Sequence, residues 1–197
     1  MAITDLTTVD TQTFANPSGT LTTDTTAVPE RLKGQDGKWR PLDATLHAAA
    51  DGTTVPAAVS SKLSFSGGGT GLMAAMATAD GKKVAFKAPF ALPKPTLLGD
   101  SALYRDVLPD VDLRLTADRQ GGWSQVLIVR TVQAAANPAV RKLRLDVEAD
   151  GLTVTGDSAG NLAVKDAQGR TRFTSPTSFM WDSAGAYRPR PPAPPRG

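Results

Sequence analysis

The stretch LRLDVEADGLTVTGDSAGNLAVKDAQGRTRFTS, residues 143–175, decides the fold class. It holds four short runs, LRLDVE, LTVT, LAVK and TRFTS, separated by the turn sequences ADG, GDSAGN and DAQG. Val and Thr favour extended backbone, whereas Gly, Asp and Asn favour tight turns. The runs begin 9 or 10 positions apart, a spacing typical of an all-β sandwich or barrel.

Further hairpins are predicted on the N-terminal side of this stretch. Turns are expected at residues 16–19, at residues 34–37 and at Gly121-Gly122, each between two strand-like runs. The total of roughly 12 to 14 strands is more than one flat sheet holds comfortably, so two packed sheets are expected. One short helical turn is predicted in residues 133–143, where Asn137 can cap and Pro138 suits the first helical position.

We therefore predict an all-β fold, a two-layer antiparallel β-sandwich over residues 1–187, followed by a Pro/Arg-rich linker or tail over residues 188–197. The final sequence YRPRPPAPPRG favours extended polyproline backbone and reads as a tether to a further domain.

The net positive charge of the chain, +3, comes from that tail. Three of the 22 basic residues lie there, at Arg188, Arg190 and Arg196, and no acidic residue follows Asp182. Residues 1–187 thus hold 19 basic and 19 acidic residues, a net charge of zero. A neutral body argues against a nucleic-acid partner, and the cluster Arg141-Lys142-Arg144 is interpreted as an exposed strand start.

The amino-acid composition also excludes several kinds of site. The absence of cysteine excludes disulfides, thiol nucleophiles and Cys-based zinc sites. The single histidine, His47, has no nucleophile motif nearby. No apolar run approaches the roughly 20 residues of a membrane-spanning helix, so membrane insertion is not expected. The N-terminus lacks a signal peptide, and we expect that one has been trimmed.

The sequence SFSGGGTGLMAAMA, residues 64–77, contains the spacing G-x-G-x-x-A of a dinucleotide-binding turn in Gly69, Gly71 and Ala74. Such a turn needs a long helix after it and an acidic residue about 20 positions further on. The following apolar run ends at Asp80-Gly81, and Pro89 stands in the corresponding region. We therefore expect no nucleotide cofactor, and a bulged loop in which glycine supplies positive φ.

The sequence RDVLPDVD, residues 105–112, brings together Asp106, Asp110 and Asp112. Paired carboxylates can perform acid/base catalysis or bind calcium. The spacing does not match an EF-hand loop. Asp112 alternates with Val111 and Leu113, so it is expected to point away from the core. The favoured interpretation is solvated turn carboxylates, with a metal site or an enzyme as weaker alternatives.

The aromatic residues offer a possible sugar-stacking platform. Trp39 and Trp123 stand beside predicted hairpin turns and are expected to be exposed, whereas Trp181 is expected to be buried. Tyr104 and Asp112 complete the set of candidate contacts for a glycan or a partner. The alternative is that the tryptophans pack in the core or at its rim.

Six segments carry a resemblance to a known class of proteins. They are QTFANPSGTLT, VPERLKGQDGKWRPLDATL, LSFSGGGTG, LPKPTLLGDSALYRDVLPDVDLRLTADRQGGWSQVLIVRT, ANPAVRKLRL and DAQGRTRFTSPTSFMWDS. In this order they resemble the β-rich N-terminal segment of large secreted actinobacterial proteins of the LamG-like or Rhs-repeat polymorphic-toxin type. A similar segment occurs in surface proteins with β-propeller repeats. One departure is Asp110, where the related loop usually has glycine.

The resemblance implies a non-catalytic structural or interaction module with an extracellular or cell-surface location. Its partners would be the downstream domains of the same polypeptide or a large toxin shell. The alternative function is a carbohydrate-binding module that uses an exposed tryptophan. No cofactor, metal or nucleic-acid partner is expected.

Overall fold

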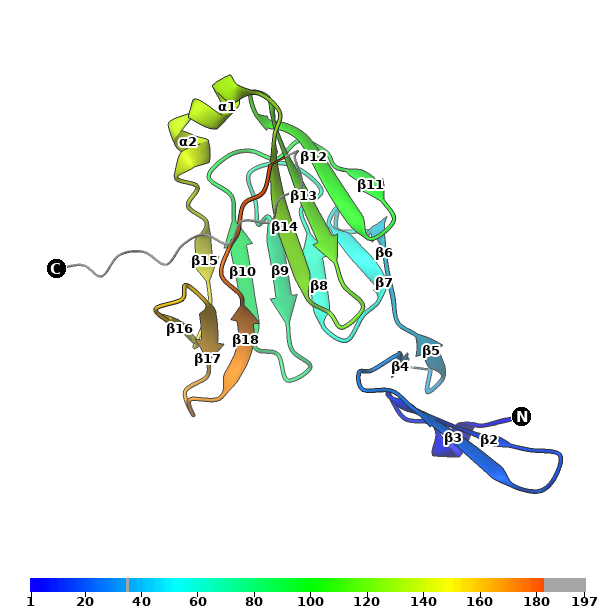
Figure 1. The fold of residues 1–197 in the computed structure, drawn as a ribbon. Helices are drawn as coiled ribbons and strands as arrows, with labels where there is room; N and C mark the ends of the chain where they lie inside the picture. The colour runs from blue at the N-terminus through cyan, green and yellow to red at the C-terminus, as the bar shows by residue number, and fades with distance from the viewer. Residues whose placement is uncertain (35, 183–197) are drawn as a thin grey trace. The chain divides into compact units, whose positions relative to one another are not determined.

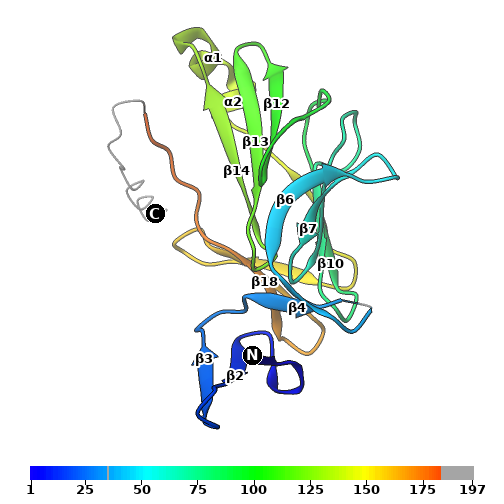
Figure 2. The same ribbon diagram turned by 90° about the vertical axis from the view of Figure 1, so that its right-hand side faces the viewer.

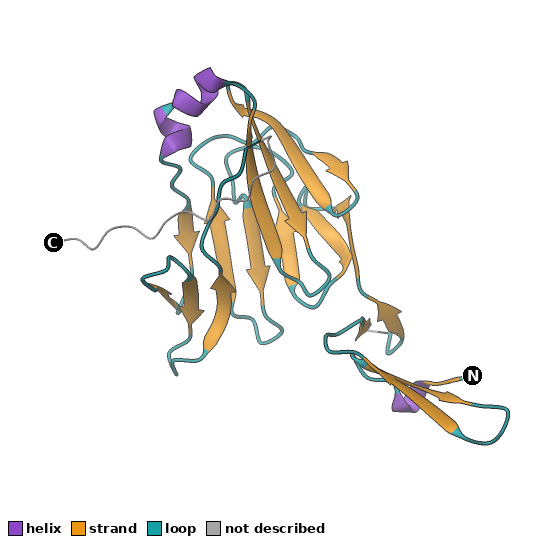
Figure 3. Ribbon diagram, in the orientation of Figure 1, coloured by secondary structure: helices purple, strands orange, loops and turns teal. Residues whose placement is uncertain are grey.

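Short strands separated by turns make up almost all of the computed structural model, which describes residues 1–34 and 36–182. Within these ranges, helix is confined to one 3-10 turn and two short α-helices (Figure 3). The chain divides into two units, residues 1–148 and residues 149–197. The sequence predicted one module over residues 1–187, because its strand spacing continues across residue 148 without a break.

Ten strands of the first unit form two antiparallel sheets that face each other (Figures 1 and 2). The six-stranded sheet has the order β15-β10-β9-β8-β7-β6, and the four-stranded sheet has the order β11-β12-β13-β14. Their bounds are β6 Asp43–Ala48, β7 Thr54–Ala58, β8 Lys62–Phe65, β9 Ala74–Ala77, β10 Lys83–Lys87, β11 Thr96–Leu98, β12 Ser101–Leu108, β13 Val111–Ala117, β14 Trp123–Val129 and β15 Asp146–Glu148. The predicted all-β, two-layer antiparallel sandwich is confirmed.

The hydrophobic core lies between these two sheets. On β13, Val111, Leu113 and Leu115 are each at most 1% exposed, which confirms the apolar face that their alternation predicts. From the opposite sheet, Leu63 and Phe65 of β8 contribute side chains that are 3% and 1% exposed. Full burial of one such side chain contributes about 1.5–3 kcal/mol, so this layer boundary is the main source of stability in the first unit.

Hydrogen bonds and a helical crossover join the two sheets. Leu46 of β6 donates its backbone N–H to the carbonyl of Gly99 at 2.8 Å, close to the start of β12. The helices α1 (Val132–Ala136) and α2 (Pro138–Arg141) carry the chain from β14 to β15. Asn137 accepts the N–H of Ala139 at 2.9 Å, and Pro138 stands at the start of α2. The predicted cap is therefore confirmed.

Two small sheets precede the sandwich. β1 (Ala2–Ile3), β2 (Thr11–Ala15) and β3 (Leu21–Thr25) form one, with the 3-10 turn η1 (Thr4–Leu6) between the first two strands. β4 (Arg31–Lys33) and β5 (Trp39–Pro41) form the other. The β2–β3 and β4–β5 pairings are the two hairpins that the sequence predicted in this region.

Seven hairpins within the described residues use the same five-residue turn. In each, the first residue donates its N–H to the carbonyl of the fifth and accepts the N–H of a glycine at the fourth position. The seven glycines have φ between +75° and +87°, which glycine adopts without the steric cost of a Cβ. They are Gly19, Gly37, Gly52, Gly81, Gly121, Gly160 and Gly169. The repeated turn explains the regular strand spacing of the sequence.

The second unit is a three-stranded meander of β16 (Thr153–Gly156), β17 (Leu162–Lys165) and β18 (Thr171–Ser175). These strands match the predicted runs LTVT, LAVK and TRFTS. The remaining run, LRLDVE, forms β15 only over its last three residues and pairs with β10 in the first unit. The predicted linker over residues 188–197 lies outside the described residues.

Candidate functional site

The glycine-rich loop after β8 packs against the backbone of neighbouring loops. Gly68 and Gly69 have φ of +119° and +92°, as the loop interpretation predicts. Gly69 exchanges two backbone hydrogen bonds with Leu92, at 2.7 and 2.8 Å. A Cβ added to Gly67 would lie 1.8 Å from the carbonyl oxygen of Gly52. Neighbouring backbone thus packs closely against the loop at Gly67 and Gly68, and no long helix follows the loop to hold a phosphate.

Tyr104 fastens the same loop from the opposite sheet. Its side chain is fully buried, and its hydroxyl donates to the carbonyl of Ser66 at 2.6 Å. Burial raises the pKa of this phenol far above its usual value. The prediction that Tyr104 contacts a glycan or a partner is therefore wrong. Strand position alone could not reveal this, because an aromatic residue on a strand can face either the core or solvent.

The structure brings Asp106, Asp110 and Asp112 together around Arg130 at one end of the four-stranded sheet. A β-bulge interrupts β12 between Tyr104 and Leu108, and it contains Asp106 at φ +53°. Asp110, in the turn to β13, has φ +59°. Both carboxylates thus depend on backbone conformations that Asp tolerates better than most side chains.

The guanidinium of Arg130 is the common partner of these carboxylates. It donates to Asp106 and lies 3.7 Å from a carboxylate oxygen of Asp112 and 3.9 Å from one of Asp110. Thr131, the N-cap of α1, donates its hydroxyl to Asp110 at 3.1 Å. Arg130 occupies the place among the carboxylates that a cation would need. Within residues 1–34 and 36–182, no group of three His, Cys, Asp or Glu side chains is placed to hold a metal ion.

The expectation of solvated carboxylates is wrong for Asp112, which is only 5% exposed. One of its carboxylate oxygens accepts the N–H of Asp106 at 2.8 Å. Alternation alone leaves the outer face of β13 open to water, whereas in the structure the bulge and Arg130 lie over Asp112. The register of the β13–β14 hairpin could have identified Arg130, because Val111 pairs with Val129 and Asp110 therefore stands beside Arg130.

Two of the tryptophans are already engaged within the fold. Trp123 is partly buried, and its ring meets Phe65 and Phe86 edge-on at 6.0 and 5.3 Å. Trp39 is also partly buried, and the ammonium of Lys33 lies 5.8 Å from its ring centre. The expectation of exposure is therefore wrong for Trp123, whose ring supports the sandwich core, and holds only in part for Trp39.

The prediction for the third tryptophan, Trp181, is wrong. Trp181 was expected to be buried, but it is 50% exposed, beside Phe179 at 52% and Met180 at 83%. The rings of Phe179 and Trp181 are 5.3 Å apart and tilted by 35°. We call residues 179–181 the apolar segment. It follows the last strand of the second unit, β18, which ends at Ser175, and Met180 forms an isolated β-bridge.

A shallow hollow of about 710 Å³ lies on the second unit beside the β16–β17 turn. The Asp157 and Asn161 side chains that line it are hydrogen-bonded within the second unit. Asn161 donates to Asp157 at 2.8 Å and accepts the N–H of Thr177 at 2.9 Å. The hydrogen bond from the Asn161 side chain is the main reason that the pKa of the Asp157 carboxyl is lowered. The hollow contains no aromatic ring among its lining residues.

Comparisons with protein-family models, with characterised proteins and with solved structures find no significant match. The resemblance described from the sequence therefore stays a prediction. In the described part of the chain, no helix has the length and apolar character needed to cross a membrane.

Proposed function

We propose that this chain is a non-catalytic structural and interaction module of a larger exported protein. In this proposal it packs against downstream domains of its own polypeptide or against a large partner shell, at the cell surface or outside the cell. The apolar segment is the principal contact.

The observation that carries the proposal is the exposure of Phe179, Met180 and Trp181 together. Three consecutive large apolar side chains, each at least half exposed, leave apolar surface in water. Removing such surface from water contributes about 25 cal/mol per Å². Aromatic residues and Met are enriched at the centre of protein interfaces and often dominate their binding energy. A protein contact over this segment therefore explains its composition.

The carboxylate cluster supports the non-catalytic part of the proposal. Each of the three carboxylates has a structural partner, because all lie around the guanidinium of Arg130 and Asp112 also accepts a backbone N–H. Their geometry is accounted for by holding the bulge of β12 and the start of α1 in place.

Site-specific photo-crosslinking tests the proposal in the protein as its cells produce it. A photoreactive phenylalanine analogue replaces Trp181, and the matched control carries it at Leu98, which is 54% exposed on β11. We expect one dominant adduct from position 181, to a defined peptide of the same polypeptide or of one partner. Equal labelling from both positions, or labelling of solvent alone at position 181, would contradict the proposal.

Carbohydrate binding is the second candidate, and the half-exposed ring of Trp181 is the observation that favours it. Rings of this kind can stack on the apolar faces of sugars. Titration with cell-wall and plant polysaccharides, followed by tryptophan fluorescence, separates the two functions. A saturable change that is lost in Trp181→Ala but kept in Trp39→Ala would support carbohydrate binding. No change with any sugar would leave protein contact as the function of the segment.

A further inference from the structure

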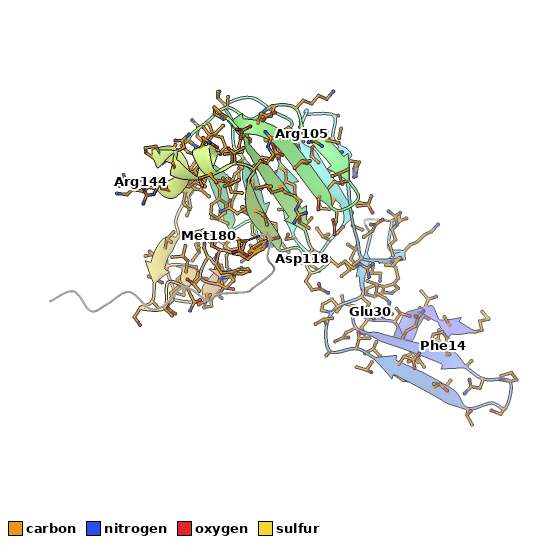
Figure 4. The ribbon with its side chains drawn as sticks, turned by 45° about the horizontal axis from the view of Figure 1, so that its top comes forward. Phe14, Glu30, Arg105, Asp118, Arg144 and Met180 are labelled. Atoms are coloured by element: carbon orange, nitrogen blue, oxygen red, sulfur yellow. The ribbon has the colours of Figure 1, made fainter. Side chains whose placement is uncertain are left out.

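The connection between α2 and β15 carries an unusual group of basic side chains. Arg141, Lys142 and Arg144 are all exposed, and nowhere else in the sequence do three basic residues fall within four positions. In the part of the chain that the structure describes, none of the three side chains forms an ion pair or a hydrogen bond. Figure 4 shows Arg144 beside α2, at the surface of the first unit.

The backbone of this connection is weakly held. α2 is a single turn of four residues, and its last hydrogen bond runs from the N–H of Lys142 to the carbonyl of Pro138 at 3.1 Å. Residues 143–145 belong to neither helix nor strand. A single helical turn has little cooperative stability of its own, so residues 141–144 can open locally without unfolding the sandwich.

Two apolar residues mark the limits of the segment. Val140 and Leu145 are partly buried against the core, whereas the three basic side chains between them point into solvent. Exposed segments that can open locally are preferred sites of proteolytic nicking. The pattern Arg141-x-x-Arg144 places one arginine at a scissile bond and a second three residues before it. Two guanidinium groups at this spacing suit a protease with acidic subsites, because charge-assisted contacts are strong and directional.

We propose that the α2–β15 connection is a processing site for an endoprotease that recognises Arg-x-x-Arg. The protease hydrolyses the peptide bond between Arg144 and Leu145. One water molecule is consumed, Arg144 gains a carboxylate and Leu145 gains an ammonium group. This inference rests on the connection alone and does not depend on the function proposed for the apolar segment.

Cleavage at this point has a specific structural consequence. β15 starts one residue after the new terminus, and it pairs with β10 through Lys87–Asp146, Phe86–Val147 and Ala85–Glu148. The Lys87–Asp146 pair also places opposite charges across the two strands. The product 145–197 therefore stays bound to the product 1–144 as a strand of the six-stranded sheet, and the nicked protein remains one particle.

The test uses the folded full chain, a limiting amount of an Arg-x-x-Arg-specific endoprotease, and intact-mass measurement. We expect a single cut after Arg144, with products that co-elute in gel filtration and separate in urea. Arg141→Gln should slow this protease about tenfold or more, as expected for the loss of a charged contact, but should leave cleavage by trypsin after Arg144 unchanged. Arg144→Gln should remove the cut.

The matched control is the double variant Lys82→Gln/Lys83→Gln, which removes the adjacent basic pair at the start of β10 and should not alter the rate. A first cut at another position, or an Arg141→Gln variant cleaved as fast as the wild type, would overturn the proposal. Cleavage of the urea-unfolded chain but not of the folded chain would also overturn it. In source cells, peptide mapping should find an N-terminus at Leu145, and finding only uncut chain would refute processing.

Discussion

The sandwich and the second unit are both antiparallel β-structure with the same glycine turns, yet different interactions hold them together. The sandwich buries a continuous apolar core between two sheets. Among residues 149–182, Val164 is the only buried hydrophobic residue, and the buried residue beside it is the charged Asp166. The comparison shows that turn chemistry sets the strand pattern, whereas burial decides which strands form a stable layer.

Asp166 illustrates how the second unit manages with so little apolar burial. Its carboxylate accepts backbone N–H groups of Gln168 and Arg170, both at 3.0 Å, and the Arg170 side-chain Nε–H at 2.9 Å. Desolvation opposes ionisation of Asp166, but these bonds from Arg170 and Gln168 outweigh it and lower the pKa of the carboxyl. A turn held by a hydrogen-bonded, buried carboxylate thus takes the place of part of an apolar core.

The largest effect is expected from Phe65→Ala, which tests whether the sandwich depends on its apolar core. Phe65 is 1% exposed and its ring contacts Trp123. Its truncation should lower the free energy of unfolding of the first unit by about 3–5 kcal/mol, through lost burial and a residual cavity. Urea unfolding monitored by tryptophan fluorescence measures this. Leu98→Ala, at a 54% exposed position, should change stability by less than about 0.5 kcal/mol.

The glycine loop provides the next test. Gly67→Ala would place a Cβ 1.8 Å from the backbone oxygen of Gly52, so the loop or the β6–β7 turn must shift. We expect a loss of about 1–3 kcal/mol in the same unfolding experiment. Gly71→Ala, in the same loop, meets no atom within 4 Å and should be nearly neutral. Equal effects of the two substitutions would contradict the close-packing account of the loop.

Arg130→Gln tests whether the carboxylate cluster is structural. The substitution leaves the buried Asp112 without its cation and removes the charge that separates three carboxylates. We expect a loss of about 1–3 kcal/mol in thermal or urea unfolding. Arg40→Gln, which breaks an exposed ion pair with Asp36, should cost less than about 1 kcal/mol. If Arg130→Gln left the free energy of unfolding unchanged, the cluster would not support the bulge.

The smallest effect is expected from acid titration of the second unit. Because folding lowers the pKa of Asp166, its stabilising contribution is complete above the usual carboxyl value of 3.8 and is lost as pH falls through the lower folded-state value. Hydrogen-exchange protection of β17 should therefore fall in this acidic range. In Asp166→Asn this pH dependence should be reduced, whereas Asp150→Asn, at an exposed position, should retain it.

The sequence predicted the turns and the layers better than the environment of individual residues. Local backbone preferences of glycine, asparagine and proline are sufficient to predict the hairpins at residues 16–19 and 34–37 and the cap at Asn137. The burial of Tyr104 and Asp112 and the exposure of Trp181 depend on contacts between distant segments. Period-two alternation identifies two faces of a strand, but it does not say whether the second face meets water, a bulge or an arginine.

The division at residue 148 could not be predicted from the sequence either, because it also depends on contacts between distant segments. LRLDVE resembles the three runs that follow it, yet its last residues pair with β10, and the paired residues are 59 to 63 positions apart in the chain. Nothing local distinguishes a strand that joins an existing sheet from one that begins a new meander. Long-range pairing decides this, and the repeated turn sequence is common to both units.

The most direct test of the proposed function is the size of the native polypeptide that carries the second unit. An antibody raised against residues 149–182 would be used on source cells and on culture medium, and it also detects the downstream product if the chain is cut after Arg144. The account predicts a band far above 20.6 kDa, or a smaller species that co-purifies with one large partner. A free 20.6 kDa chain without any partner would contradict it.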